Sequence, residues 1–199
     1  MNKKTYSSSI KKTPYKYAIS KRIAKLILEG CDRQAVFNKC FYENYIEVDS
    51  EERRREITNI IFARLVNIDN YLLKQFYDGD VETSKFILVY AIAKSDLMFF
   101  EFMFEIYREA LIGKKDYISI DDFENFFISK KETDLTVSKW GDYTIDQLSK
   151  GYRNILVESG MGEREKRNIK AKKVMIHPAV QDHIKQIGDV KYLKALLGE

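Results

Sequence analysis

The chain has 199 residues, which fits one compact domain or two small ones, and its 45% apolar and 32% charged residues exclude an intrinsically disordered chain. The net charge of +4 is uneven: residues 1–30 carry eight basic residues against one acidic, residues 31–150 carry 16 against 23, and residues 151–180 carry seven against three. Two basic zones that flank an acidic middle are typical of a protein that binds a polyanion, although an ordinary solvated surface can have the same pattern.

The first half of the sequence predicts helices joined by short turns. The chain has only 9 Gly and 2 Pro, which favours long helices over a many-stranded sandwich. Thr13-Pro14 is typical of a helix start and Gly30 of a helix end, and the tight junction before a second helix near Asp32 allows a helix-turn-helix. Later helices are expected at about 51–66, 69–77, 81–94 and 97–112. The last two are apolar most of the way round, so we expect them at the centre of a bundle.

The second half predicts a different order of elements. Gly113-Lys114-Lys115 reads as a boundary, so we predict an N-terminal helical bundle with a basic tail (1–115) and a winged-helix-like C-terminal domain (116–199). Helices are expected at about 119–130, in a short stretch before Trp140, at 142–158, at 178–187 and at 189–197. The alternation in NIKAKKVMI suffices for a short two-stranded ribbon. The predicted fold is therefore all-α: a helical bundle with helix-turn-helix elements and at most that one ribbon.

The predicted helix 142–158 has an apolar arc, and its opposite arc carries Thr144, Gln147, Lys150, Gly151 and Asn154. In a winged helix-turn-helix the second helix of the motif enters the major groove of DNA. Gln and Asn can each make two hydrogen bonds to adenine, and Thr can touch a thymine methyl group. A glycine would let the DNA backbone approach closely. Any amphipathic helix has a polar arc, but the order of elements favours a nucleic-acid interface.

Further cations could contact phosphates, which sets affinity but not sequence choice. Arg53, Arg54 and Arg55 are weaker candidates, because Asp49, Glu51, Glu52 and Glu56 can neutralise them locally. Lys3, Lys4, Lys11 and Lys12 could form a basic arm. The predicted DNA-binding residues are Lys21, Arg22 and Lys25 near the N-terminus, Thr144, Gln147, Lys150, Arg153 and Asn154 on the long helix, and Lys166, Arg167, Lys170, Lys172 and Lys173 on the ribbon, where Arg164 belongs to the same basic run.

Nothing in the sequence favours catalysis. His177 and His183 have no second ligand cluster beside them, so helix-cap or surface roles are favoured over metal binding. Glu101, Glu105 and Glu109 form a stripe that could chelate a metal if a second acidic helix faced it, but such a stripe is more often the solvated side of a helix. There is no Gly-rich phosphate loop and no G-x-S-x-G motif. We therefore expect no enzymatic activity, no cofactor and no metal site.

The sequence also predicts a cytoplasmic protein. The longest uncharged apolar run, FILVYAIA, has eight residues, whereas a membrane-spanning helix needs about 20. The basic N-terminal stretch has no apolar core, so it lacks the pattern of a secretory signal. Cys31 and Cys40 lie on different turns and cannot pair within one helix, which favours a reducing compartment.

Five segments in order carry a family resemblance: YSSSIKKTPY, SEERRREITNIIFARL, GDVETSKFILVYAIAKSDLMFFEFMFEIYREAL, KWGDYTIDQLSKGY and GDVKYLKALLGE. Together they resemble the BrxA family, a small core component of bacteriophage-exclusion (BREX) defence systems, over essentially the whole chain. The resemblance implies an all-helical cytosolic protein that acts beside a methyltransferase, an ATPase and a phosphatase-like protein to block phage DNA replication. It also implies binding of double-stranded DNA through helix-turn-helix elements rather than catalysis, and it brings no catalytic motif with it.

Two functions stay open at this stage. The first is a non-enzymatic accessory protein that binds double-stranded DNA, and the second is an assembly scaffold whose basic zones dock an acidic partner protein. A metalloenzyme built on the glutamate stripe is a distant third. The DNA hypothesis predicts that affinity falls steeply with salt, since each phosphate contact releases counterions.

Overall fold

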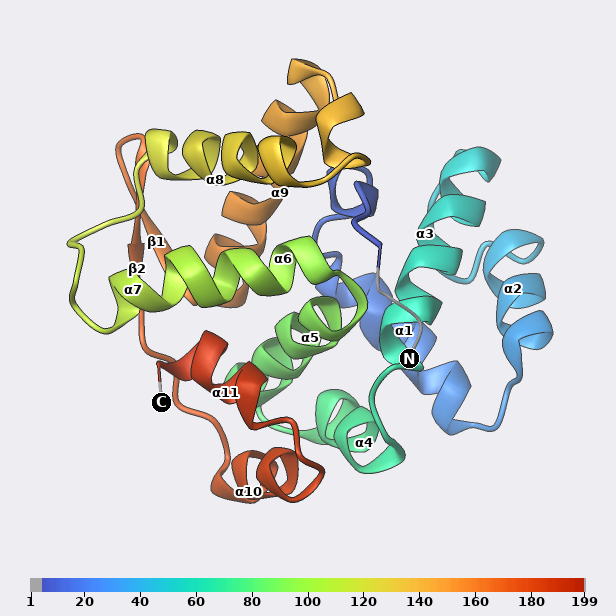
Figure 1. The fold of residues 1–199 in the computed structure, drawn as a ribbon. Helices are drawn as coiled ribbons and strands as arrows, with labels where there is room; N and C mark the ends of the chain where they lie inside the picture. Colours follow the sequence, from blue (N-terminus) through green and yellow to red (C-terminus); the bar gives the residue numbers. More distant parts are fainter. Residues whose placement is uncertain (1–4, 199) are drawn as a thin grey trace. The chain divides into compact units, whose positions relative to one another are not determined.

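The computed structural model describes residues 5–198 and divides into two compact units (Figure 1). We call residues 16–95 the N-terminal unit, and residues 5–15 together with residues 96–198 the C-terminal unit. The sequence suggested a boundary after residue 115, whereas the structure divides the chain after Ser95. Asp96 starts a new helix there by accepting a hydrogen bond from the backbone N–H of Phe99, and that helix packs with the elements that follow it.

The N-terminal unit consists of five helices. Side chains of Asp32, Ser50 and Asp69 each accept a hydrogen bond from the backbone N–H three residues further on, so helices α2, α3 and α4 begin where local capping chemistry predicts. The first helix starts later than Thr13-Pro14 suggested, because Lys16 has left-handed backbone angles (φ 56°) that a helix cannot continue through. The bounds are α1 (Tyr17–Leu28), α2 (Arg33–Phe41), α3 (Glu51–Leu65), α4 (Asn70–Asp78) and α5 (Val81–Ser95).

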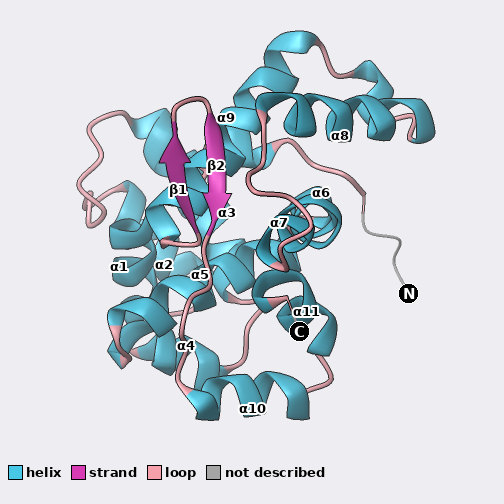
Figure 2. Ribbon diagram, turned by 90° about the vertical axis from the view of Figure 1, so that its left-hand side faces the viewer, coloured by secondary structure: helices cyan, strands magenta, loops and turns pink. Residues whose placement is uncertain are grey.

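The C-terminal unit combines helices with one hairpin (Figure 2). Strands β1 (Gly162–Glu165) and β2 (Asn168–Ala171) are antiparallel, with Glu163 opposite Lys170. A mostly α-helical fold with one short ribbon was predicted and is confirmed. The helical elements are the 3-10 turn η1 (Ser9–Lys11), α6 (Leu97–Phe102), the π-helical turn η2 (Met103–Tyr107), α7 (Arg108–Leu111), α8 (Ile120–Thr133), the 3-10 turn η3 (Val137–Lys139), α9 (Asp142–Ser159), α10 (Pro178–Gln186) and α11 (Val190–Leu197). Within residues 5–198 no helix is both long and apolar enough to cross a membrane.

An aromatic cluster forms the core of the C-terminal unit. The ring of Phe102 on α6 lies 4.9 Å from that of Phe123 on α8 and 5.1 Å from that of Tyr152 on α9, measured between centroids. Tyr152 also packs edge-on against Phe99, with 5.1 Å between the ring centroids. Each such pair contributes about 0.5–1.5 kcal/mol beyond the area it buries. Helices α6, α8 and α9 are therefore held together by one set of rings.

The hydroxyl group of Tyr152 is buried inside this cluster. It has no hydrogen-bond partner among the described residues. Burial, and after it the carboxylates of Asp96 and Glu101, raise the pKa of Tyr152 well above its ordinary value, so the group stays protonated. A buried hydroxyl without a partner costs roughly 1–3 kcal/mol of stability.

We therefore expect Tyr152→Phe to raise the free energy of unfolding of the C-terminal unit by about 1 kcal/mol, because it removes that unpaired polar group. Phe102→Ala should lower the same quantity by about 3–5 kcal/mol, because it leaves a cavity among the rings. Trp140 is the only tryptophan and lies in this unit, so its fluorescence during urea unfolding reports on the correct part of the chain. A clear loss of stability in Tyr152→Phe would show that the hydroxyl has a partner after all.

Candidate nucleic-acid interface

The candidate interface is built by α8, η3, α9 and the hairpin. Ser119 and Asp122 start α8 with a reciprocal capping box. Just before it, Ile118 pairs with Ile169 of β2 through two backbone hydrogen bonds of 2.8 and 2.9 Å, so this segment adds a short third edge to the hairpin. The Tyr107 hydroxyl lies 3.0 Å from the carbonyl oxygens of Met161 and Lys172, which flank the hairpin at its open end, opposite the turn. The hairpin is thus anchored at its open end and along β2.

One part of the predicted polar arc of α9 is covered. Gly151 is buried, and a Cβ atom added to it would lie 2.9 Å from the Cγ2 atom of Ile10 in η1. The Lys11 ammonium donates a hydrogen bond of 3.3 Å to the Thr144 hydroxyl. The prediction that Gly151 opens α9 to a DNA backbone is therefore wrong: the missing side chain forms a notch that the side chain of Ile10 fills.

The other polar side chains of α9 are half-buried or exposed and make contacts within the unit. The Lys150 ammonium lies 2.7 Å from the Asp146 carboxylate, to which Gln147 also donates a hydrogen bond of 3.2 Å. The Asn154 side-chain oxygen accepts a hydrogen bond of 3.0 Å from the Arg164 guanidinium. Exposed pairs of this kind contribute at most about 1 kcal/mol each, so they can exchange for other partners.

Arg153 connects α9 to the tip of the hairpin. Its guanidinium donates a hydrogen bond of 3.1 Å to the carbonyl oxygen of Arg167. Burial, and after it the positive charge of Arg164, lower the pKa of Arg153. The guanidinium groups of Arg153 and Arg164 therefore lie close enough to form one positive region.

The hairpin concentrates the cations that have no acidic partner. Lys166 and Arg167 form its two-residue turn, and Lys166 has a φ angle of 56°, in the left-handed region that favours glycine. Lys172 pairs with Glu163 at 3.2 Å. Within the part of the chain that the structure describes, no ion pair involves the exposed side chains of Lys166, Arg167, Lys170 or Lys173.

The predicted cations of α1 lie in the other compact unit and make contacts there. The Lys21 ammonium donates hydrogen bonds to the carbonyl oxygens of Phe76 and Tyr77, where α4 ends. Arg22 lies 2.6 Å from Glu47, and this hydrogen bond raises the pKa of Arg22. Lys25 lies 3.8 Å from Glu29, one turn further on. All three cations therefore have roles within the N-terminal unit.

The remaining predicted cations divide in the same way. Arg53 pairs with Glu56 at 2.9 Å and Arg54 with Glu51 at 3.8 Å, which confirms the predicted local neutralisation for these two. Arg55 instead lies over the ring of Phe41, 5.1 Å from its centroid. Lys12 is exposed beside η1, and Lys3 and Lys4 lie outside the described residues.

The glutamate stripe is paired with a lysine rather than with a second acidic helix. The ammonium of Lys130 on α8 lies 2.8 Å from both Glu101 and Glu105, and the Tyr6 hydroxyl donates a hydrogen bond of 2.8 Å to Glu101. Burial alone would lower the pKa of Lys130, but the hydrogen bonds to these two carboxylates outweigh it and raise the pKa. Glu109 pairs with Lys114 at 3.2 Å. Residues 5–198 contain no group of three or more His, Cys, Asp or Glu that could hold a metal ion.

His177 is the one histidine whose predicted role can be read directly. Its ring nitrogen Nδ1 accepts a hydrogen bond of 3.2 Å from the backbone N–H of Ala179, at the start of α10. The predicted helix-cap role is confirmed for this residue.

Comparison with known proteins identifies the family. The BrxA family model matches residues 4–188. The BREX protein BrxA of Bacillus cereus (strain H3081.97) is 34% identical over 199 residues, which cover all of both chains. The chain belongs to the BrxA family. This BrxA-family protein is thus a component of a BREX phage-defence system, as the sequence resemblance implied. A crystal structure of an uncharacterized protein from Magnetospirillum magneticum has the same fold, with a TM-score of 0.83, 20% identity, and coverage of 98% of this chain and 99% of that one.

Sequence reasoning missed the segment that covers α9 in this BrxA-family protein. A glycine in the middle of a helix costs about 1 kcal/mol relative to alanine, which suggests that another element packs closely there. Ile10 is the single apolar residue in the run SSSIKKT, and it is fully buried. Those two signals together could have paired η1 with α9.

We expect Gly151→Val to displace the N-terminal segment, because its Cβ atom would clash with Ile10 and with the backbone oxygen of that residue, 3.3 Å away. Tryptic cleavage after Lys11 and Lys12 should become several-fold faster, while the helical circular dichroism is retained. Gly141→Ala is the matched control, since nothing lies within 4 Å of a Cβ atom at that position. Equal cleavage rates in the wild type and Gly151→Val would contradict the packing of η1 on α9.

Proposed function

We propose that this protein is a non-enzymatic, cytoplasmic accessory protein of its BREX system that binds double-stranded DNA through the hairpin and the adjoining side of α9. The order of elements supports this proposal. Helices α6–α7, the short edge at Ile118, α8, α9 and the hairpin follow one another as in a winged helix-turn-helix, with the hairpin as the wing.

The observation that carries the proposal is the unpaired positive charge at the tip of the hairpin. A left-handed conformation costs a residue with a side chain roughly 1–2 kcal/mol, and glycine would avoid this cost at position 166. The chain instead has a lysine there, next to Arg167 and without an acidic partner among the described residues. A lysine at this position does not stabilise the fold, but it can bind a phosphate group.

The charges of α9 indicate how the DNA is contacted. Asp142 and Asp146 are exposed in its first half, and carboxylates there would repel a phosphate backbone. Arg153 and Asn154 lie in the second half, and each is hydrogen-bonded to a residue of the hairpin. We therefore place the contact on the hairpin and the second half of α9, with phosphates supplying most of the affinity.

A salt titration tests the proposal with the full chain. Four cations without an acidic partner, Lys166, Arg167 and Lys170 in the hairpin and Lys173 just after it, predict a log–log slope of DNA affinity against salt of roughly −3.6. Lys170→Glu with Lys173→Glu should weaken binding to every duplex sequence and bring the slope to about −1.8, because two phosphate contacts are lost. Asn154→Ala should leave the slope unchanged and reduce differences in affinity between sequences, whereas Gln147→Ala, in the first half of α9, should change neither.

The outcome of this titration separates the proposal from its rival. No binding at low salt, or a slope near zero, would rule out the DNA interface. The unpaired cations would then favour a scaffold that docks an acidic protein. Mobility-shift measurements on duplex DNA, single-stranded DNA and RNA at each salt level give the slopes and the preference together.

Lys166→Gly separates binding from folding at the tip of the hairpin. Glycine adopts a φ of 56° without strain, so the free energy of unfolding should stay constant or rise by up to about 1 kcal/mol. DNA affinity should fall, and the salt slope should become shallower by about 0.9. The matched control is Lys166→Arg, which keeps the positive charge at the same position. Lys185→Gly would be a less suitable control, because Lys185 lies in a helix. Unchanged DNA affinity in Lys166→Gly would remove the tip from the interface.

A further inference from the structure

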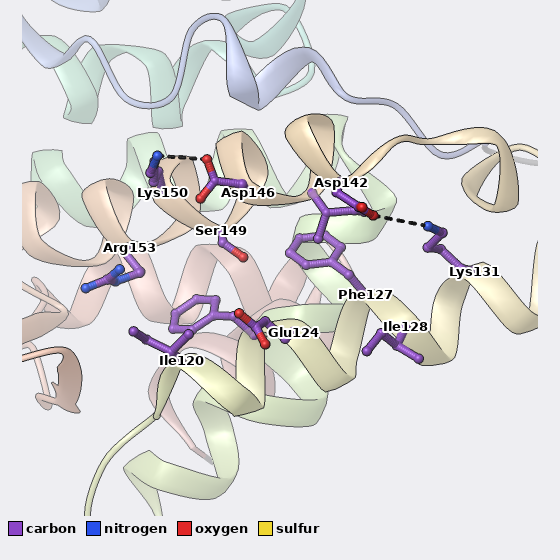
Figure 3. Close-up of a pocket in the computed structure, with 12 residues that line it drawn as sticks. Ile120, Glu124, Phe127, Ile128, Lys131, Asp142, Asp146, Ser149, Lys150 and Arg153 are labelled. Carbon is purple, nitrogen blue, oxygen red and sulfur yellow. Dashed lines mark hydrogen bonds and ion pairs between the residues drawn. The ribbon is translucent and has the colours of Figure 1, made fainter.

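A cavity of about 430 Å³ opens between α8 and α9 (Figure 3). Helix α8 lines it from Ile120 to Lys131, and helix α9 lines it from Asp142 to Arg153. On each helix the lining residues are spaced at positions 0, 3, 4, 7, 8 and 11, so three consecutive turns face the cavity. Those turns extend over roughly 16 Å at 1.5 Å per residue. The cavity is thus a groove between two parallel rows of side chains.

The floor of the groove is apolar and partly open to solvent. Phe123 and Phe127 are buried beneath it, and Ile120 and Ile145 are half-buried along it. Ile128 has 52% of its surface exposed, which makes it one of the large exposed apolar residues of this unit. An apolar row that repeats with every helical turn is the surface against which another amphipathic helix packs.

Four of the six charged side chains around the groove form ion pairs, and Arg153 and Glu124 do not. Lys131 lies 3.9 Å from Asp142, and Lys150 lies 2.7 Å from Asp146. Arg153 points to the carbonyl oxygen of Arg167. Glu124, in the middle of the α8 row, is exposed and takes part in no ion pair with a described residue. The groove therefore has one carboxylate left for a cation of an occupant.

Ser149 contributes a polar residue to the α9 wall of the groove. Its hydroxyl is inaccessible to water, has no hydrogen-bond partner among the described residues, and comes from the α9 wall of the groove (Figure 3). The lining has three carboxylates (Glu124, Asp142 and Asp146) and three cations (Lys131, Lys150 and Arg153), so it has no net positive charge that would attract a nucleic acid.

We propose that this groove binds an amphipathic helix of about three turns from another protein of the same BREX system, with a Lys or Arg at its centre paired to Glu124. Apolar residues of that helix, at intervals of three and four, would cover Ile128 and the two phenylalanines. The inference does not rest on DNA binding, since Lys166, Arg167, Lys170 and Lys173 do not line the groove and Arg153, at its end, is the residue that it shares with the proposed DNA contact.

The test uses the full chain and synthetic peptides. Overlapping 15-residue peptides that tile the other proteins encoded by the same BREX system are labelled and titrated with the wild type by fluorescence anisotropy. We expect at least one peptide with an apolar stripe and a central Lys or Arg to bind and to gain helical circular dichroism. Ile128→Arg should weaken that binding at least tenfold. Leu135→Arg adds the same charge at a residue that is 84% exposed and does not line the groove, so it should change the affinity less than twofold.

A charge exchange tests the role of Glu124. Glu124→Lys should weaken the same peptide about tenfold, which corresponds to about 1.4 kcal/mol, and replacing the central Lys or Arg of the peptide by Glu should restore the affinity. The proposal is overturned if no peptide binds or if Ile128→Arg does not weaken binding. It is also overturned if the Glu-substituted peptide does not regain affinity for Glu124→Lys.

Two parallel measurements separate other outcomes. If Ile128→Arg converts a dimer into a monomer in analytical ultracentrifugation, a second copy of the chain occupies the groove and the proposal is wrong. DNA affinity is measured on the same variants. Peptide binding without DNA binding would refute the proposed function and support this inference. DNA binding without peptide binding would support the proposed function and refute this inference.

Discussion

The contact of Tyr152 with Phe102 and Phe127 holds three helices of the C-terminal unit together. These rings come from α9, α6 and α8, and their centroids lie 5.1 and 5.5 Å from that of Tyr152. Because the rings fix α8 and α9 at their inner faces, the outer faces stay apart and a groove remains between them. The same contact fixes the direction in which α9 ends, at Gly160 with a φ of 81°, and hence where the hairpin begins. The positions of the groove and of the hairpin therefore both depend on where these rings hold helix α9.

The basic side chains of this protein fall into two groups: those that bind a partner within their own unit, and those that have no acidic partner. In the N-terminal unit, Lys21 binds the carbonyl oxygens at the end of α4 and Arg22 binds Glu47, so their charges are compensated where they stand. In the hairpin, Lys166 and Lys170 have no acidic partner in the described structure although Glu163 and Glu165 are near in sequence. A count of basic residues treats these two groups alike. Only the folded arrangement distinguishes a cation that completes a helix end from one that is available to a phosphate.

The sequence was informative where structure is local. Capping by Asp32, Ser50 and Ser119 involves residues three apart, so the starts of α2, α3 and α8 could be predicted from short motifs. The apolar arc of α9 was also correct, since Leu148, Tyr152, Ile155 and Leu156 are all buried. The covered side of α9 could not be predicted in this way, because its partner Ile10 lies about 140 residues away and no periodic pattern links the two. Similarly, a helical wheel shows which side chains share a face, but it does not show that the rows of α8 and α9 leave a groove between them.

The chain's two basic zones are partly reunited by this long-range packing. Residues up to Tyr15 belong to the C-terminal unit although α1 follows two residues later in the other unit, so the N-terminal segment is a strap on α9 and not the start of its own bundle. The strap is held by Ile10 in the notch of Gly151, by Lys11 at Thr144 and by Tyr6 at Glu101. Since the hairpin is anchored to the same helix through Arg153 and Asn154, α9 joins cations from both ends of the sequence in one compact unit. Of the N-terminal basic zone, Lys11 and Lys12 therefore share a compact unit with the hairpin, whereas Lys21, Arg22 and Lys25 belong to the other unit.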